Sequence, residues 1–195
     1  MPPNPTVAHT WNGREDSLAR RMGNIMAEVQ ELFGPRDESF LFIGWEFSGN
    51  HPQLRLSDNG ARLALIQLSM GASASWSAAV HELAHECVHL LSPVAGMTNN
   101  LEEGVATWYQ TQFYLREFDR DPGIYQPYLG AFEAVTDLFE CADAGPNVIR
   151  DLRRKSLAFG DITASDILDA APELDVGTAD FLVRQWESGS RRDPL

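Results

Sequence analysis

The sequence contains few cysteines and no long hydrophobic run. Its 195 residues include only two cysteines, Cys87 and Cys141, too few for a disulfide framework, so we expect reduced thiols and a cytoplasmic protein. The first residues, MPPNPTVAHTWNG, lack the basic cluster and apolar run of a secretory signal. No apolar stretch approaches membrane-spanning length, so no membrane association is expected.

Basic residues are also scarce. There are 15 lysines and arginines against 28 acidic residues, which gives a net charge of -13. Such a charge repels nucleic acid and anionic membranes, so neither is an expected partner. Apolar residues make up 44% of the chain and no internal repeat is present. These properties predict one folded domain, residues 1–195, with a sizeable core.

The pattern of apolar residues predicts a helix followed by a small sheet. Apolar residues recur at three- and four-residue steps over 16–33, which indicates an amphipathic helix. Residues 40–47 alternate and are rich in aromatic and branched side chains, as in a strand. Asn59-Gly60 separates two further apolar runs and predicts a hairpin. We therefore expect a small antiparallel sheet of about three strands between residues 40 and 70.

The rest of the chain reads as mostly helical. A helix is expected from Ser75 or Ser77 to about Leu91, where Ser92-Pro93 ends it, and a second over 101–118. Further helices are expected near 126–142, 146–159, 163–170 and 177–187. The order of helix, strands and helices predicts an α+β fold, with a core over 13–120 and a helical C-terminal part over 121–195.

The segment HELAHECVH, residues 81–89, contains two overlapping His-Glu-x-x-His patterns. Histidines four residues apart lie about 40° from each other on a helix, so their rings can converge on one metal ion. One register uses His81, Glu82 and His85, and the other uses His85, Glu86 and His89. In either register the glutamate would be a general base rather than a ligand, and a catalytic zinc needs a third protein ligand.

Glu102 and Glu103 are the candidates for that third ligand. Glu103 follows His85 by 18 residues, which leaves room for the first helix to end and a second to return alongside. Glu103 follows His89 by only 14 residues, and His89 is close to the helix-breaking Ser92-Pro93. This spacing favours zinc ligands His81, His85 and Glu103 with Glu82 as base, while the second register stays open.

HELAH followed by the glutamate of EEGVATW resembles the gluzincin branch of the zinc metallopeptidases over about residues 40–118. The resemblance implies a zincin-like fold, zinc ligands His81, His85 and Glu103, and Glu82 as the base in peptide-bond hydrolysis. It also implies that Gly104 and Ala106 let the two site helices pack closely. A strand at the sheet edge, here 63–69, would pair with a peptide or protein substrate.

The chain departs from the family at two places. Thermolysin-like members have an aspartate four residues after the ligand glutamate, where this chain has Thr107. The family also supplies a residue that stabilises the oxyanion, for which Tyr125 and Tyr128 are candidates by their place in the sequence. The competing hypothesis is a non-catalytic metal-binding or protein-interaction protein on a zincin scaffold. A di-iron centre is disfavoured, because two Glu-x-x-His units on one helix cannot face one site.

Overall fold

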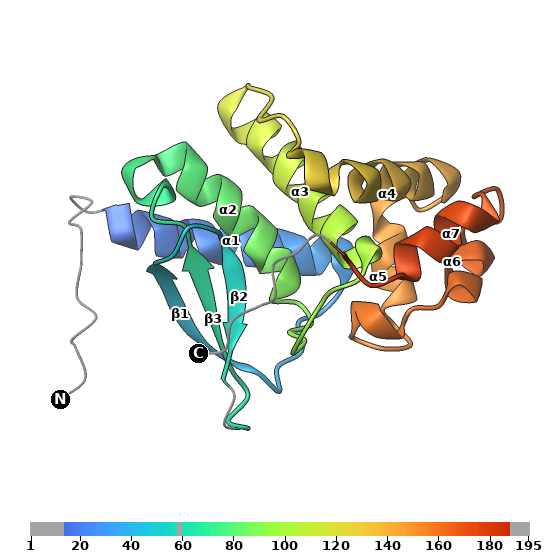
Figure 1. The fold of residues 1–195 in the computed structure, drawn as a ribbon, viewed down its shortest axis with the longest axis horizontal. Helices are drawn as coiled ribbons and strands as arrows, with labels where there is room; N and C mark the ends of the chain where they lie inside the picture. The colour runs from blue at the N-terminus through green and yellow to red at the C-terminus, as the bar shows by residue number, and fades with distance from the viewer. Residues whose placement is uncertain (1–13, 58–59, 188–195) are drawn as a thin grey trace.

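The computed structural model describes residues 14–57 and 60–187, which form a small sheet covered by helices (Figure 1). Residues 1–13 and the first part of the Asn59-Gly60 turn lie outside these ranges. The fold is of mixed α and β type, as predicted, and most of it is helical. Its elements are α1 (Arg14–Phe33), β1 (Leu41–Phe47), β2 (Gln53–Leu56), β3 (Leu63–Leu68), α2 (Trp76–His89), α3 (Asn100–Phe118), α4 (Leu129–Cys141), α5 (Val148–Leu152), α6 (Ala164–Ala170) and α7 (Val176–Val183).

The three strands form a mixed sheet, not the antiparallel sheet that was expected. Their order is β1-β3-β2: β2 and β3 are antiparallel, as the hairpin pattern predicts, but β1 is parallel to β3. Strand β3 therefore lies in the centre with both edges paired, and the expectation that 63–69 is an edge strand is wrong. Strand β2 is the edge strand beside α2 (Figure 1).

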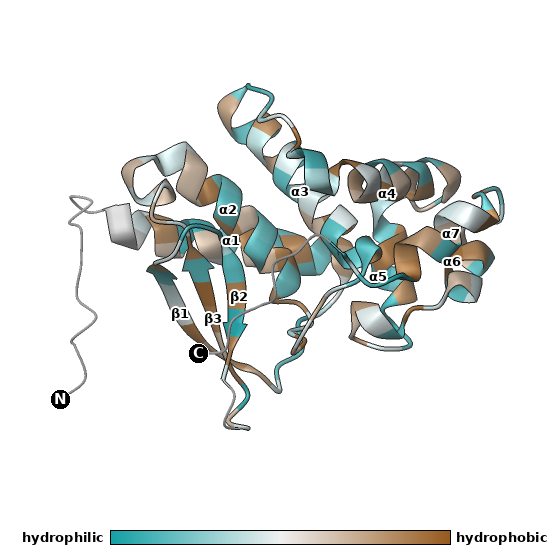
Figure 2. Cartoon of the chain, viewed as in Figure 1, coloured by the Kyte–Doolittle hydropathy of each residue, from teal (hydrophilic) through white to brown (hydrophobic). Residues whose placement is uncertain are grey.

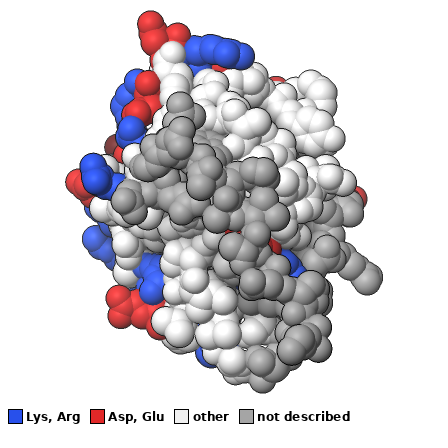
Figure 3. All heavy atoms as spheres, turned by 90° about the vertical axis from the view of Figure 1, so that its left-hand side faces the viewer, with Lys and Arg blue, Asp and Glu red and all other residues white. Residues whose placement is uncertain are grey.

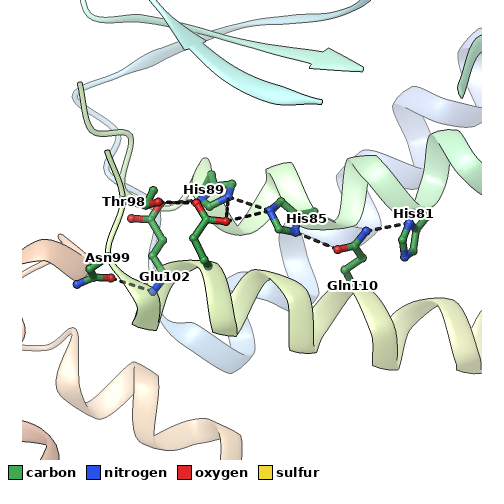
Figure 4. A network of polar contacts seen from close by, with 8 residues as sticks. His81, His85, His89, Thr98, Asn99, Glu102 and Gln110 are labelled. Atoms are coloured by element: carbon green, nitrogen blue, oxygen red, sulfur yellow. Dashed lines mark hydrogen bonds and ion pairs between the residues drawn. The ribbon is translucent and has the colours of Figure 1, made fainter. Parts of the chain in front are cut away.

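Helices α2 and α3 lie side by side and run in opposite directions (Figures 1 and 4). Ser75 caps the start of α2 by accepting from the amide of Ala78, and Asn99 caps α3 by accepting from the amide of Glu102. Ten residues, 90–99, connect the two helices. The last turn of α2 therefore lies against the first turn of α3.

The C-terminal helices pack on α3 and complete the core. Buried apolar side chains from Leu18 in α1 to Leu182 in α7 form one cluster, and brown, apolar segments recur in both halves of the chain (Figure 2). The helix expected over 146–159 is only α5, because the chain turns back after Leu152. The helix expected over 177–187 ends at Val183, and residues 184–187 instead pair with the chain beside α3.

A buried arginine joins the two halves of the chain. Arg153 is 1% exposed, and its guanidinium donates to five main-chain carbonyls. Three of these follow one another at the end of α1 (Phe33, Gly34 and Pro35), and one belongs to Leu91, just past α2. Since the guanidinium of an arginine has five N–H groups, these five carbonyls use its full donor capacity.

Charged groups of both signs share the surface. On the face shown in Figure 3, acidic and basic side chains lie next to each other along one border, beside a larger uncharged area. Two ion pairs of this kind connect α3 to α1, Arg21 with Glu117 and Arg116 with Glu28. Among the described residues, no helix combines the length and apolar character that crossing a membrane requires.

Gly104 lets α3 approach α4, rather than α2 as the family resemblance implied. A Cβ at this position would lie 2.4 Å from the carbonyl oxygen of Ala131 and 2.5 Å from Cγ2 of Val135. We expect Gly104→Ala to lower the free energy of unfolding by about 1–3 kcal/mol, because part of the clash is with main chain. Denaturant unfolding measures the change.

Gly23→Ala is the matched control for this substitution. Gly23 lies inside α1, is exposed, and has no heavy atom within 4 Å of an added Cβ. Alanine there should raise stability by about 0.5–1 kcal/mol, since it restricts the unfolded chain without a clash. Equal effects of the two substitutions would contradict the packing described for α3 and α4.

Candidate metal centre

His85, His89 and Glu103 bring three potential ligand atoms together between α2 and α3. Figure 4 shows the two histidines on the side of α2 that faces α3. The Nε2 atoms of the two histidines are 3.0 Å apart. Oε2 of Glu103 lies 3.5 Å from Nε2 of His85 and 3.6 Å from Nε2 of His89. All three residues are buried. Within the described part of the chain, this is the one group of three such residues close enough to share a metal ion.

The spacing of the three atoms fits zinc. Zinc binds imidazole nitrogen and carboxylate oxygen at about 2.0–2.2 Å, so two ligand atoms on a tetrahedron around it are about 3.3 Å apart. The observed separations of 3.0, 3.5 and 3.6 Å bracket that value. Two imidazoles and one carboxylate also match the donor set of catalytic zinc sites that keep a fourth position open. The residues present therefore fit the metal that the sequence predicted.

The structure groups two of the three expected ligands, His85 and Glu103, and places His81 and Glu82 elsewhere. The ring of His81 contacts Gln110 and Tyr114. The carboxylate of Glu82 accepts hydrogen bonds from the amide and the hydroxyl of Ser69, at 2.8 and 2.6 Å, and so ties α2 to the end of β3. The structure therefore follows the second register, His85-Glu86-x-x-His89, at the metal cluster.

Antiparallel packing explains this choice of register. Because the two antiparallel helices are joined by a loop of ten residues, the end of α2 faces the start of α3. His89 is the last residue of α2, and Glu103 lies in the first turn of α3. His81 lies eight residues before His89, about 12 Å along the helix at 1.5 Å per residue. It faces Gln110 instead (Figure 4).

Both candidate ligand histidines are oriented through their other ring nitrogen. Nδ1 of His89 is 2.7 Å from a carboxylate oxygen of Glu102, and Nδ1 of His85 is 2.9 Å from the amide oxygen of Gln110. Both oxygens can only accept, so each Nδ1 donates its proton. A carboxylate or amide partner of this kind fixes the tautomer of a metal-binding histidine and presents Nε2 to the ion.

The ligand carboxylate is held in the same way. The hydroxyl of Thr98 donates to Oε1 of Glu103, which leaves Oε2 turned toward the histidines. Burial alone would raise the pKa of Glu103, but His89 and His85 outweigh it and hold that pKa well below its usual range. Glu103 is therefore ionised at neutral pH. When both rings are neutral, the site presents two nitrogen lone pairs and one carboxylate oxygen to a common point, an arrangement that attracts a cation.

His81 belongs to the outer part of this network. Gln110 accepts from His85 through its oxygen, so its nitrogen donates to Nδ1 of His81, at 2.8 Å. Burial, together with the nearby His85, lowers the pKa of His81 to about 4, so its ring is neutral and able to accept. Gln110 thus orients a candidate ligand histidine, His85. The family resemblance gives that role to an aspartate at the position of Thr107. The hydroxyl of Thr107 has no hydrogen-bond partner within the described part of the chain.

A cavity of about 330 Å³ opens beside the three ligands. Glu86, the acid of the second register, contributes to its wall, as does Tyr128, whose ring packs against His85 with centroids 5.5 Å apart. Tyr125, the other candidate for oxyanion stabilisation, is 73% exposed and does not line the cavity. The remaining described lining residues are Gly49, Asn50, His51, Pro52, Gln53, Gln67, Gly96, Met97, Thr98 and Trp186.

Sequence reasoning missed the partners that orient the ligands. Gln110 follows Glu103 by seven residues, which is two helical turns, so it shares a face of α3 with Glu103. That spacing is a usable signal. Thr98 gives no such signal, because it lies in a loop whose path depends on the fold.

Comparisons of the chain with protein-family models, with curated proteins and with solved structures find no match.

His89 and His81 form a matched pair for testing the metal site. We expect His89→Ala to abolish stoichiometric zinc binding, because it removes a ligand from a three-ligand set. His81→Ala should retain zinc with a smaller loss of affinity, since His81 only contacts Gln110. Elemental analysis after dialysis against zinc measures both. Zinc retained by the His89 variant and lost by the His81 variant would restore the first register.

Proposed function

We propose that this protein is a zinc-dependent peptidase in which His85, His89 and Glu103 hold the metal and Glu86 is the general base. The observation that carries the proposal is the convergence of the three ligand atoms, each with its own orienting partner, beside an open cavity that Glu86 lines. The His-Glu-x-x-His pattern with a downstream glutamate is the reason for choosing peptide hydrolysis among metal-dependent reactions.

The balance of buried charge also supports a divalent cation. Three buried glutamates, Glu86, Glu102 and Glu103, lie at or next to the cluster, and none is more than 6% exposed. Arg153 is the buried cation that interacts with this group, through Glu102. Buried charges are strongly unfavourable unless they are compensated. A cation bound at the cluster would compensate the ionised carboxylate of Glu103.

The residues of the site have distinct roles in the proposed reaction. His85, His89 and Glu103 would hold the zinc ion, which would supply Lewis-acid activation of water and of the substrate carbonyl. Glu86 accepts the proton from the attacking water and delivers it to the leaving amine. Tyr128 lines the same cavity beside His85, so its hydroxyl is the candidate donor to the developing oxyanion. Glu102, Gln110 and Thr98 keep the ligands oriented throughout.

The sheet offers a place for an extended substrate. Strand β2 is an edge strand, and Gln53 at its start lines the cavity together with the β1–β2 connection over 49–52. That connection is fixed by Gln67, which donates to the carbonyl of His51. An extended peptide that lies along β2 toward its start would therefore pass the metal cluster. This assigns to β2 the role that the resemblance gave to residues 63–69.

A metal site without catalysis is the alternative function. The deep burial of the ligands favours it, because structural zinc sites are closed. The cavity wall formed by Glu86 and Tyr128 favours catalysis, since a purely structural site requires neither.

Glu86→Gln tests the proposed mechanism, and Glu82→Gln is its matched control on the same helix. The first substitution should lower the rate of peptide hydrolysis by a factor of about 10²–10⁴, because it removes the base while leaving the ligands in place. The second should keep most of the activity, since Glu82 binds Ser69. Cleavage of a peptide library with and without chelator, alongside zinc content, provides both measurements.

The pattern of losses separates the hypotheses. Hydrolysis that survives Glu86→Gln but not Glu82→Gln would assign the base to the first register. Stoichiometric zinc with no cleavage of any peptide by the wild-type chain would support the non-catalytic alternative.

A further inference from the structure

The four residues that follow α7, Arg184–Glu187, lie along the loop that leads into α3. We call this segment the C-terminal strap. The amide of Asn100 donates to the carbonyl of Arg184, at 2.9 Å, and the amide of Trp186 donates to the carbonyl of Thr98, at 2.8 Å. Between these two bonds Asn99 and Gln185 form an antiparallel bridge. The strap thus holds the last two residues of the loop, Thr98 and Asn99, and the first residue of α3, Asn100.

The strap also reaches the metal cluster through its side chain. The indole of Trp186 is 7% exposed and stacks on the ring of Tyr128, with centroids 5.1 Å apart and an angle of 5° between the planes. Tyr128 in turn packs edge-on against His85. Both aromatic rings line the cavity beside the ligands. Two routes therefore connect the strap to the site: main chain to Thr98, and ring stacking to His85.

We propose that the C-terminal strap positions the metal site, and that Trp186 is its principal positioning residue. The proposal rests on the proposed metal site, and adds that zinc affinity depends on a segment more than 80 residues beyond Glu103. The strap fixes Thr98, whose hydroxyl orients Glu103, and it holds Tyr128 against His85.

The loop that carries Thr98 needs such support. A second cavity, of about 180 Å³, is lined by Met97 and Thr98 of this loop and by Val183 and Gln185. Side-chain packing beside the loop is therefore incomplete, so the main-chain bonds to the strap fix its position. Loss of these bonds would let Thr98 move and Glu103 rotate.

The C-terminal strap gives α7 a role in positioning the metal site. Helix α7 packs on both α3 and α4, and it ends where the strap begins. Its placement therefore sets the position of the strap relative to the first turn of α3. The C-terminal part of the chain, which the sequence left without a function, would act on the site in this way.

Two shortened chains provide the first test. One ends at Val183 and lacks the strap, and the control ends at Glu187 and keeps it. Removing a partner that orients a metal ligand lowers metal affinity about 10- to 100-fold. We expect a loss in this range for the shorter chain and unchanged affinity for the control. Competition with a chromophoric chelator measures zinc affinity at a temperature where circular dichroism shows both chains folded.

Full-length variants keep the test decisive if the shorter chain does not fold. Trp186→Ala should weaken zinc binding, while Trp186→Phe should restore most of it, because phenylalanine can still stack on Tyr128. Thr98→Val should weaken zinc binding by a similar factor. The combined variant Trp186→Ala and Thr98→Val should lose less than the product of the two single losses, because both act on one contact pathway.

The outcomes separate the strap from the metal site itself. Suppose that Trp186→Ala lowers the thermal midpoint of the zinc-free protein but leaves the zinc affinity of the folded chain unchanged. That result would overturn the positioning role, and the metal site would stand. Wild-type protein that does not bind zinc would overturn the proposed function and the strap together.

Discussion

The antiparallel contact between the last turn of α2 and the first turn of α3 is the constraint on which the site depends. It places a histidine at the C-terminal end of one helix and carboxylates at the N-terminal end of the other. The helix dipoles favour this distribution, since negative groups are stabilised at the start of a helix and positive groups at its end. The ten-residue connection makes the two ends meet. The ligands, their partners and the cavity all follow from that meeting.

Polar groups are unusually concentrated at this contact. Around the three candidate ligands stand Glu102, Gln110 and Thr98, and each bonds one ligand. Such a network in the interior is unfavourable unless every member is satisfied. Here each candidate ligand uses one polar atom in a hydrogen bond to its orienting partner. Its other polar atom faces the other two ligands, at the place where an ion would bind. The burial that makes the network costly also keeps its geometry fixed.

The sequence predicted the elements better than their relations. Helical and strand periodicities located α1, the three strands and the two site helices, because local spacing alone determines these patterns. The parallel pairing of β1 with β3 was missed, since strand order depends on contacts distant in sequence. For the site, the segment 81–89 and Glu103 were identified, yet spacing favoured His81 over His89. The length of a connection does not show which helical turns face each other, and here α2 ends at His89 itself.

Arg153 makes the two parts of the chain interdependent. Its guanidinium donates hydrogen bonds to carbonyls at the end of α1 and to that of the residue after the C-cap of α2, although the arginine itself lies beyond residue 120. Divided there, the carbonyls at the end of α1 would lose this donor, and the guanidinium would lose four of its five acceptors. The part of the chain that contains the candidate metal centre is therefore not a detachable module: its fold is completed by an arginine from the C-terminal part.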